Sequence, residues 1–457
     1  MILGRKNELG YLNQVYGTEG SQLIVLYGKK NIGKTTLLMD FLKDKESLYY
    51  LAVDASVRQQ QYLMARQWKE AGISVSVYPD YRELMDSFAK STQDKKVLVI
   101  DEFDNLIKND SDFMQHVTAL TGGDPSNGQV LVILCSSSVG FVENQLVGKI
   151  GRAALSISGF LKIRELRFEE LSHHFPDYSL EDRIAVYAIL GGIPGLWKYF
   201  DPQIPLKQNI CKNILQSDAF LFDEGSRMVR DAVRECSVYY SILSALASGL
   251  DKLGDIYRHT GFSRAKISVY LKNLMELEIV EKVFSVDTRG MNMQRKGIYR
   301  ISNHFVDFWF RFLYPHYSMT QTLTSENFYE KYISLRLSDY CNPYFSRICR
   351  EYMEDLAQSR GFGFEVETSG IFDGKEGFID YLATDEDDEH CVAAFCCYDK
   401  PYMTYEFYEN AMKTLAGAKA TPDLLFLFAR EGFDEKVTLE AKVRGDVRLL
   451  PMREVFV

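Results

Sequence analysis

The segment at residues 28–35 constrains the fold of this chain more than any other. It reads Gly-Lys-Lys-Asn-Ile-Gly-Lys-Thr, follows the apolar run 23–27 and precedes the amphipathic stretch 36–42. This order of strand, loop and helix is the setting of a phosphate-binding loop, in which backbone N–H groups and the positive end of the helix face a polyphosphate. The alternative is a chance Gly-Lys-Thr loop between a strand and a helix. We expect nucleotide binding by Gly28, Lys29, Lys30, Asn31, Ile32, Gly33, Lys34, Thr35 and Thr36.

Two residues of this loop have separate expected roles. Lys34 would lie along the β- and γ-phosphates as a mobile positive charge, which makes it both a binding and a catalytic residue. The Thr35 hydroxyl would be a ligand of the Mg²⁺ ion that accompanies ATP. The sequence therefore predicts ATP and Mg²⁺ as cofactors.

A pair of acids follows a second apolar run at residues 97–100. Such a run is typical of a buried parallel strand, so Asp101 and Glu102 would lie at the carboxyl end, where open α/β sheets bind ligands. We expect Asp101 to hold Mg²⁺ through its water shell and Glu102 to orient or deprotonate the attacking water. Because Asp alone suits binding and the added Glu suits hydrolysis, the pair indicates an ATPase. The alternative is an ordinary strand end that enters an acidic turn with Asp104.

A third apolar run, residues 130–134, ends in Cys-Ser-Ser-Ser at residues 135–138. We expect the hydroxyl of Ser136 or Ser137, of which we choose Ser137, to sense the γ-phosphate or fix the water. Capping of the following helix is the alternative. Further alternation predicts a doubly wound parallel sheet, with strands near residues 48–53 and 73–78 and helices near 57–71 and 82–90.

Motifs on either side of this region resemble those of a known family. Residues 2–9 read Ile-Leu-Gly-Arg-Lys-Asn-Glu-Leu, and residues 191–194 read Gly-Gly-Ile-Pro. They resemble the apolar-apolar-Gly-Arg-Glu-x-Glu opening and the Gly-x-Pro motif of the STAND branch of AAA+ ATPases. More closely, the chain resembles the archaeal-type ATPases of prokaryotes, in which a Gly-Arg pair, here Gly151-Arg152, follows the last core strand.

This resemblance implies roles for three further residues. The segments of Arg5 and Pro194 would close over the adenine, and Arg152 would contact the phosphates, within its own subunit or across an interface. Lys6 departs from the family pattern, because it stands where the first acid of the opening motif is expected. Without the resemblance, Arg5 and Arg152 would be surface cations.

Length and composition indicate several domains and no membrane contact. A chain of 457 residues exceeds one core and suggests about three domains. No apolar run approaches the ~20 residues that cross a bilayer and no secretion signal opens the chain, so we expect a cytoplasmic protein. The eight cysteines form neither a zinc pattern nor a disulfide framework. We expect a P-loop core at 1–158, a helical lid at 159–232, a winged helix-turn-helix at 233–318 and a nuclease-like domain at 319–457.

Charge is unevenly distributed along the chain. The net charge is −10, and residues 321–457 hold 15 Lys and Arg against 26 Asp and Glu, a balance of −11. Residues 236–305 hold 10 Lys and Arg against 6 Asp and Glu, a balance of +4. Any contact with nucleic acid therefore belongs to the middle of the chain.

The basic middle segment resembles a winged helix-turn-helix. Its apolar periodicity predicts helices and then two strands, with Ile267, Leu271 and Leu274 on the buried face. The expected elements are helices at 239–247, 253–259 and 264–277 and strands at 281–286 and 297–301. The side chains expected to contact DNA are Arg264, Lys266, Ser268 and Lys272 on the third helix and Arg289, Arg295 and Lys296 on the wing. The alternative is a module that packs between domains.

The segment after the winged helix is rich in aromatic residues. Residues 305–315 resemble the Phe- and Trp-rich segment that joins the winged helix to the C-terminal domain in the archaeal-type ATPases. Physically, a helix with this many rings must be buried between domains. A role at a membrane surface is the weaker alternative, because the segment is short and lacks a basic face.

In those relatives the C-terminal domain resembles a restriction endonuclease, with Glu-x-Asp on one strand and Glu-x-Lys on the next. Strands expected at 377–382 and 392–398 keep Asp380 alone, with Phe378, Phe395 and Cys397 at the other three positions. Because a lone carboxylate does not assemble a Mg²⁺ site, we expect no nuclease activity. The acidic run 385–389 would be a solvated hairpin loop that repels DNA.

The sequence therefore predicts an α/β protein with a doubly wound P-loop ATPase core, a helical lid, a winged helix-turn-helix and an α/β nuclease-like C-terminal domain. We interpret it as an ATP-driven switch for a protein or DNA partner, with the C-terminal domain as a docking surface for a protein. A nucleotide-locked DNA-binding regulator with negligible turnover is the first alternative. An ATP-dependent nuclease is the second.

Overall fold

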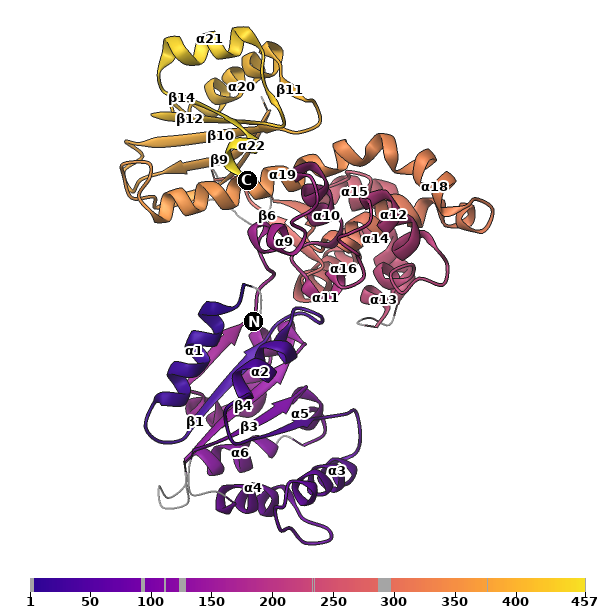
Figure 1. The fold of residues 1–457 in the computed structure, drawn as a ribbon, viewed down its shortest axis with the longest axis vertical. Helices are drawn as coiled ribbons and strands as arrows, with labels where there is room; N and C mark the ends of the chain where they lie inside the picture. Colours follow the sequence, from indigo (N-terminus) through magenta and orange to yellow (C-terminus); the bar gives the residue numbers. More distant parts are fainter. Residues whose placement is uncertain are drawn as a thin grey trace. The chain divides into compact units, whose positions relative to one another are not determined.

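The chain folds into two compact units. The computed structural model describes residues 4–91, 95–110, 112–122, 129–231, 233, 235–286, 297–375 and 377–456. The first unit holds Met1–Glu165 with Ile193–Gly195, and the second holds Leu166–Gly192 with Leu196–Val457. Figure 1 shows the elements of each unit, coloured along the chain.

The first unit is built on a five-stranded parallel sheet. Its strands are β1 Gln22–Tyr27, β2 Ser47–Leu51, β3 Lys96–Asp101, β4 Val130–Ser136 and β5 Gly159–Lys162. They stand in the order β2-β3-β4-β1-β5, and every neighbouring pair is parallel. Every residue of β3 and β4 is buried, as expected for central strands that are covered on both faces.

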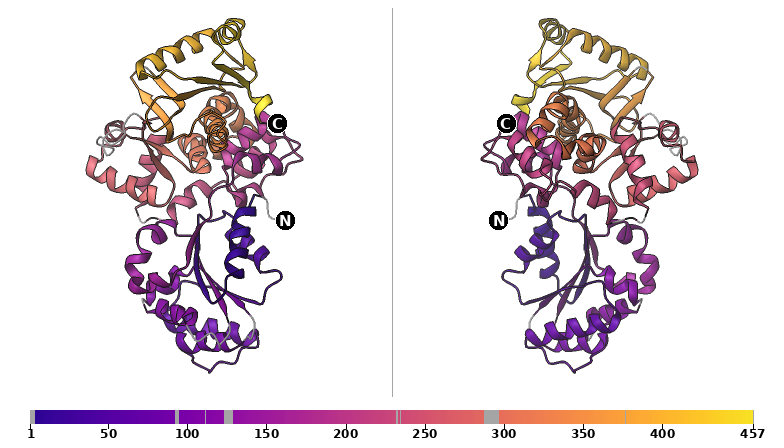
Figure 2. Two further views of the ribbon diagram at one scale, coloured as in Figure 1. Left: turned by 90° about the vertical axis from the view of Figure 1, so that its left-hand side faces the viewer. Right: turned by 90° about the vertical axis from the view of Figure 1, so that its right-hand side faces the viewer.

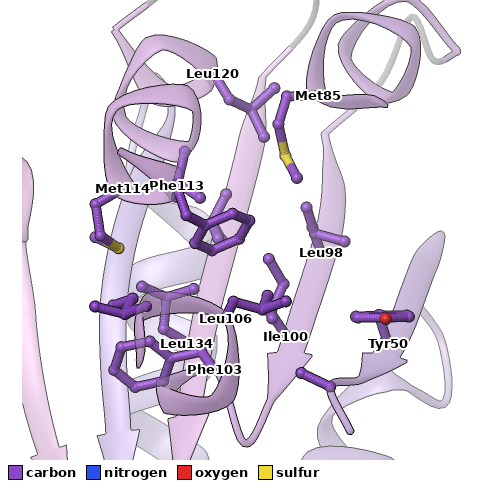
Figure 3. Packing of buried hydrophobic residues seen from close by; sticks show 14 of the residues in the cluster. Tyr50, Met85, Leu98, Ile100, Phe103, Leu106, Phe113, Met114, Leu120 and Leu134 are labelled. Atoms are coloured by element: carbon purple, nitrogen blue, oxygen red, sulfur yellow. The ribbon is translucent and has the colours of Figure 1, made fainter. Parts of the chain in front are cut away.

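Helices cover both faces of this sheet (Figure 2), which confirms the doubly wound arrangement. They are α1 Lys6–Gly17, α2 Lys34–Leu42, α3 Val57–Glu70, α4 Tyr81–Lys90, α5 Asp104–Asn109, α6 Phe113–Thr121, α7 Val139–Asn144 and α8 Leu146–Ile150. On one face, Phe113 and Met114 of α6 pack with Leu98 and Ile100 of β3 and Leu134 of β4 (Figure 3). This apolar layer holds the strands whose carboxyl ends carry the polar site residues.

The strand expected at residues 73–78 is absent, and the chain there is irregular. Val77 and Tyr78 are 68% and 74% exposed. The Ser76 N–H donates to Glu83 Oε1 at 2.6 Å rather than to a neighbouring strand. The expectation was wrong because alternating apolar and polar residues also occur in an exposed connection that has no strand partner.

The expected boundary placed the start of the helical lid at residue 159, but the structure places residues 159–162 in the first unit. Residues Gly159–Lys162 form β5, whose residues pair with Ile24–Tyr27 of β1. The first unit therefore continues to Glu165. The four-residue length of β5 explains the error, because so short a strand carries little periodic signal.

The second unit begins with a helical segment. Its helices are α9 Phe168–His174, α10 Leu180–Leu190, α12 Leu206–Ile210, the π-helix Cys211–Leu215 and α13 Glu224–Arg230. The short helix α11, Pro194–Trp197, begins within the segment that belongs to the first unit.

A winged helix-turn-helix follows, as the sequence predicts. It comprises α14 Cys236–Ala247, α15 Leu253–Thr260, α16 Arg264–Glu276 and the antiparallel strands β6 Val280–Val283 and β7 Ile298–Ile301. Ile267, Leu271 and Leu274 are fully buried, which confirms the inward face of α16. The Ser263 hydroxyl accepts the Lys266 N–H at 3.2 Å and caps the same helix. The three cations expected on the wing, Arg289, Arg295 and Lys296, lie outside the described residues.

The aromatic segment is helical and buried, although it is not one regular α-helix. After α17, His304–Phe308, the chain forms a π-helix at Trp309–Leu313 and a 3₁₀ segment at Tyr314–Gln321. The Trp309 indole N–H donates to the Phe222 carbonyl at 2.7 Å. Phe308 and Phe312 both pack on Tyr340 of the long helix α19, Leu337–Gln358. The segment thus links the lid helices to the C-terminal part of the unit.

The C-terminal part holds a second five-stranded sheet. Its strands are β8 Thr368–Gly374, β9 Gly377–Thr384, β10 Cys391–Cys397, β12 Leu424–Ala429 and β14 Val447–Pro451, in the order β14-β12-β10-β9-β8. β8, β9 and β10 are antiparallel, whereas β10, β12 and β14 are parallel. Helices α20, Tyr405–Ala418, and α21, Glu435–Arg444, contribute to the core of this sheet. The acidic run 385–389 joins β9 to β10, which confirms the hairpin loop.

Within the described residues, the longest helices lack a stretch apolar enough to span a bilayer.

Candidate active site

The backbone of residues 28–33 forms a tight loop at the carboxyl end of β1. A Cβ atom on Gly28 would lie 2.5 Å from the carbonyl oxygen of Ile163, which follows β5. Only glycine therefore allows the loop to lie this close to the backbone after β5. Asn31 and Gly33 have φ angles of 64° and 97°, which turn the loop back toward the start of α2. The loop therefore leads directly into a helix N-terminus, the arrangement that favours bound phosphate.

Lys34 reaches back across this loop. Its ammonium group donates to the carbonyls of Gly28 and Lys29 at 2.8 and 2.9 Å and to the Ser137 hydroxyl at 2.9 Å. The side chain is buried, and desolvation lowers the pKa of the amine from its usual range. A cation held in this way is ready to exchange carbonyl oxygens for phosphate oxygens.

Glu102 and Ser137 complete a polar chain with Lys34. Glu102 accepts the Ser137 N–H at Oε2, 3.1 Å away, and the Ser137 hydroxyl at Oε1. Glu102 also has a φ of 51°, an uncommon left-handed conformation for a residue other than glycine. The ends of β3 and β4 and the start of α2 thus bring together three of the four residues expected to be catalytic, and the fourth is Arg152.

Ser136 has a different position from its neighbour. It is fully buried, and its hydroxyl donates to Asp104 Oδ1 at 2.9 Å. The Ser136 hydroxyl oxygen also accepts the Ser138 N–H at 3.0 Å. Of the two candidate serines, only Ser137 is therefore joined to Lys34 and Glu102.

Asp101 lies at the end of β3 and is largely buried. Its Oδ1 accepts the Glu102 N–H at 3.0 Å, and its Oδ2 accepts the hydroxyl of Tyr49. Tyr49 comes from β2, the strand next to β3. Burial and the contact with Asp101 raise the pKa of the Tyr49 phenol. Sequence reasoning missed Tyr49, because it requires knowing that β2 lies next to β3.

The residues at this site fit a magnesium nucleotide. Thr35 is exposed at the start of α2 and Asp101 ends β3, so hard oxygen donors of the kind Mg²⁺ prefers are present. Thr35 and Asp101 are the residues that would hold the ion, which would neutralise phosphate charge when bound. Lys30, Asn31, Thr35 and Thr36 are exposed and thus accessible to a ligand.

Arg5 and Pro194 both lie against the phosphate loop. Arg5 is buried, and its guanidinium donates to the Ile32 carbonyl at 2.9 Å and to Glu8 Oε1 at 3.0 Å. A Cβ atom on Gly33 would lie 3.6 Å from Pro194 Cγ. The two residues that the family resemblance singled out thus flank the loop, and their contact with adenine stays a prediction.

Arg152 is not part of this cluster. It is exposed in the 3₁₀ segment Gly151–Ser156, which leads into β5. The Ser158 N–H donates to the Leu23 carbonyl at 2.7 Å, near the amino end of β1, whereas the phosphate loop follows the carboxyl end. Its role at the phosphates stays a prediction.

Asp380 is a buried residue whose oxygens are already occupied. Oδ1 accepts the Ser346 hydroxyl, and Oδ2 accepts the Cys396 N–H at 2.9 Å. Burial raises the pKa of this carboxyl, while the nearby Arg350 and Arg300 oppose the shift. Across the described ranges, no three or more His, Cys, Asp and Glu side chains gather in a way that could hold a metal ion. The inactivity of the nuclease-like domain stays a prediction.

The candidate DNA-contacting face of α16 is open. Arg264, Lys266, Ser268 and Lys272 are all exposed. The Arg264 guanidinium lies 5.4 Å from the ring centroid of Tyr257 on α15, and Lys272 pairs with Glu276 at 3.8 Å. In a helix-turn-helix, the residues at the start of the recognition helix, here α16, are the ones that contact base edges in the major groove.

A glycine loop after β1, a lysine that crosses it and an Asp-Glu pair after β3 define the first unit as a P-loop ATPase domain. Residues 2–200 match the model of an ATPase domain found predominantly in Archaea. The chain thus carries an archaeal-type ATPase domain. Residues 240–282 match bacterial regulatory proteins of the arsR family, and residues 309–410 match archaeal and bacterial proteins of unknown function.

Comparison with whole proteins finds similar chains in Archaea. The chain is 26% identical over 395 residues to an uncharacterized protein of Methanocaldococcus jannaschii, and the match covers 86% of each. It is similar to the structure of a Walker-type ATPase of Pyrococcus abyssi, with 16% identity, a TM-score of 0.49 and coverage of 68% of this chain and 96% of that one. It is also similar to the structure of the ORC2 protein of Aeropyrum pernix in ADPNP–ADP complexes. The identity is 13%, the TM-score is 0.46, and the match covers 68% of this chain and 92% of that one.

Proposed function

We propose that this protein is a Mg²⁺-dependent ATPase that works as a nucleotide-driven switch for a protein or DNA partner. The observation that carries the proposal is that the phosphate loop is bonded to both segments through which the chain passes between its two units. Lys29 pairs with Glu165 at 2.7 Å, and Glu165 is the last residue before the first crossing. The Gly195 N–H donates to the Asn31 carbonyl at 3.0 Å, and Gly195 precedes another crossing.

These contacts give nucleotide a physical route to the rest of the chain. A triphosphate at the loop competes with Glu165 for the Lys29 charge and fixes the backbone at Asn31. Either change alters the bonds that restrain residues 165 and 195. A ligand shifts a conformational equilibrium only through such differential contacts.

The residues assigned to hydrolysis have separate tasks. Lys34 exchanges its loop carbonyls for phosphate oxygens, and Glu102 orients the attacking water. Ser137 holds the side chains of Lys34 and Glu102 in position through its hydroxyl. Thr35 and Asp101 hold the ion that neutralises the phosphates.

Phosphate release measures the enzymatic part of the proposal. Lys34→Ala and Glu102→Gln should each abolish most of the release seen with the native chain. Lys43→Ala, which removes an exposed lysine just beyond α2 and outside the phosphate loop, is the matched control and should keep near-native release. Equal rates from the native chain, Lys34→Ala and Glu102→Gln would remove the claim of hydrolysis.

Hydrogen exchange measures the switch itself. Amide protection at residues 163–167 and 192–196 should differ between the free, ADP-bound and ATP-bound states, and the differences should vanish in Lys34→Ala. Changes confined to residues 28–35 would contradict a switch while leaving the ATPase intact.

DNA is the partner that the winged helix favours, on account of the exposed cations of α16. Binding of duplex DNA should weaken as salt rises and should be lost on Arg264→Glu. Arg66→Glu, at an exposed arginine of α3 in the first unit, is a charge-matched control and should bind as the native chain does. Salt-insensitive binding, or an equal loss in both variants, would point to a protein partner instead.

A further inference from the structure

Tyr49 occupies an unusual position at the ATPase site. Its hydroxyl donates to Asp101 Oδ2. Asp101 is one of the two residues that would hold Mg²⁺. The Tyr49 hydroxyl therefore occupies a carboxylate oxygen that the water shell of the ion would use.

The strand register explains how Tyr49 reaches this place. Leu51 of β2 pairs with Asp101 of β3, so Tyr49 lies two residues back on the neighbouring strand, on the same face as Leu51. Its ring spans the gap to the carboxylate. The Gln67 side chain donates to the Tyr49 carbonyl and anchors the strand from α3.

The bonds of Asp101 show what Tyr49 contributes in the metal-free protein. Oδ1 already accepts the Glu102 N–H at 3.0 Å, so the Tyr49 hydroxyl satisfies the second oxygen of a buried carboxylate. A buried anion that lacks such partners is costly. Water molecules bound to Mg²⁺ would donate to the same oxygen and replace this contact.

We propose that Tyr49 is a placeholder for the magnesium shell: it satisfies Asp101 in the metal-free protein and releases it when Mg²⁺·nucleotide binds. This inference rests on the ATPase site of the proposed function and is independent of the switch. Tyr49 is a positioning residue that opposes metal binding. It keeps the site ordered without the ion and lowers the factor by which Mg²⁺ tightens nucleotide binding.

The direction in which Tyr49→Phe changes the effect of Mg²⁺ on ADP binding distinguishes two roles for Tyr49. In one role its hydroxyl competes with the metal shell, and in the other it stabilises the bound metal. Tyr49→Phe removes the hydroxyl, so the metal-free form loses a hydrogen bond to a charged group and Mg²⁺ no longer has to displace it. The factor by which Mg²⁺ tightens ADP binding should therefore increase, by about tenfold. If the hydroxyl instead supported bound metal, the same factor would fall.

Tyr50 supplies a matched control. It is the next residue of β2, is buried, and donates its hydroxyl to Gln60 Oε1 at 2.5 Å, away from Asp101. Tyr50→Phe removes the same atom from the same strand. The factor by which Mg²⁺ tightens ADP binding should stay within about twofold of the native value in this variant.

The test is calorimetric titration of the full chain with ADP, in EDTA and at a series of Mg²⁺ concentrations. The native chain must bind ADP in EDTA, and failure there would count against the ATPase site itself. A larger Mg²⁺ factor in Tyr49→Phe alone supports the placeholder role. An unchanged or smaller factor in Tyr49→Phe, or an equal rise in Tyr50→Phe, overturns it.

A second measurement keeps the inference testable if Tyr49→Phe unfolds. Crystal structures of the native chain with ADP, with and without Mg²⁺, should differ at this contact. The Tyr49 hydroxyl should be hydrogen-bonded to Asp101 without the ion and outside hydrogen-bonding distance with it. Retention of the bond in the Mg²⁺ complex overturns the proposal.

Discussion

Gly28→Ala should disturb the phosphate loop at its first residue. The added Cβ would lie 2.5 Å from the Ile163 carbonyl oxygen, and a real Cβ contact is essentially never shorter than 3.0 Å, so the two segments must separate by at least the difference. The neighbour is backbone and cannot rotate away. Overpacking of this kind costs about 1–3 kcal/mol of unfolding free energy. Because the loop N–H groups must keep their alignment, the ADP dissociation constant should rise about tenfold or more, which corresponds to about 1.4 kcal/mol.

Gly10→Ala is the control for this change. Gly10 lies within α1, and nothing stands within 4 Å of its added Cβ. Alanine in a helix is preferred over glycine by about 0.5–1 kcal/mol, so this variant should be slightly more stable and should bind ADP normally. Urea unfolding and ADP calorimetry measure both quantities. Native stability and affinity in Gly28→Ala would refute the close approach of the loop to the chain after β5.

Three further outcomes are expected. Ser137→Ala removes the hydroxyl that joins Lys34 to Glu102 and should slow phosphate release about tenfold or more, whereas Ser138→Ala, at an exposed neighbour, should leave the rate unchanged. Burial lowers the pKa of Lys34 and a bound diphosphate opposes that shift, so ADP binding in alkaline buffer should take up protons. Calorimetry in buffers of different ionisation enthalpy detects this uptake, and proton release would contradict the placement of Lys34. The native chain should leave duplex DNA uncut with Mg²⁺ or Mn²⁺, and cleavage that Asp380→Ala abolishes would contradict the inactive C-terminal domain.

The sequence alone could identify the groups that act at the carboxyl ends of β1, β3 and β4. Each of these strands is a continuous apolar run followed at once by its polar residues, so the local pattern gives both the element and the position of Lys34, Asp101 and Ser137. Parallel strands bring such ends to one edge. The position of each residue along its own strand was sufficient to predict that these groups lie at one edge of the sheet. The order of the strands in the sheet was not needed.

Tyr49 shows where that reasoning stops. Its importance comes from the pairing of β2 with β3, and local periodicity does not say which strands are neighbours. The choice between Ser136 and Ser137 likewise depends on partners, since one hydroxyl bonds Asp104 and the other bonds Glu102. The prediction of a strand at 73–78 was wrong for the same reason. Alternating apolar and polar residues indicate which side of a segment is exposed, but they do not show whether a neighbouring strand is available for pairing.

The most direct test of the central claim is a crystal structure of the native chain with Mg²⁺ and a non-hydrolysable ATP analogue. The account predicts that backbone N–H groups of residues 31–35 bond the phosphates and that the Lys34 amine has left the carbonyls of Gly28 and Lys29 for a phosphate oxygen. A nucleotide bound elsewhere, or Lys34 still on those carbonyls beside a bound triphosphate, would contradict it.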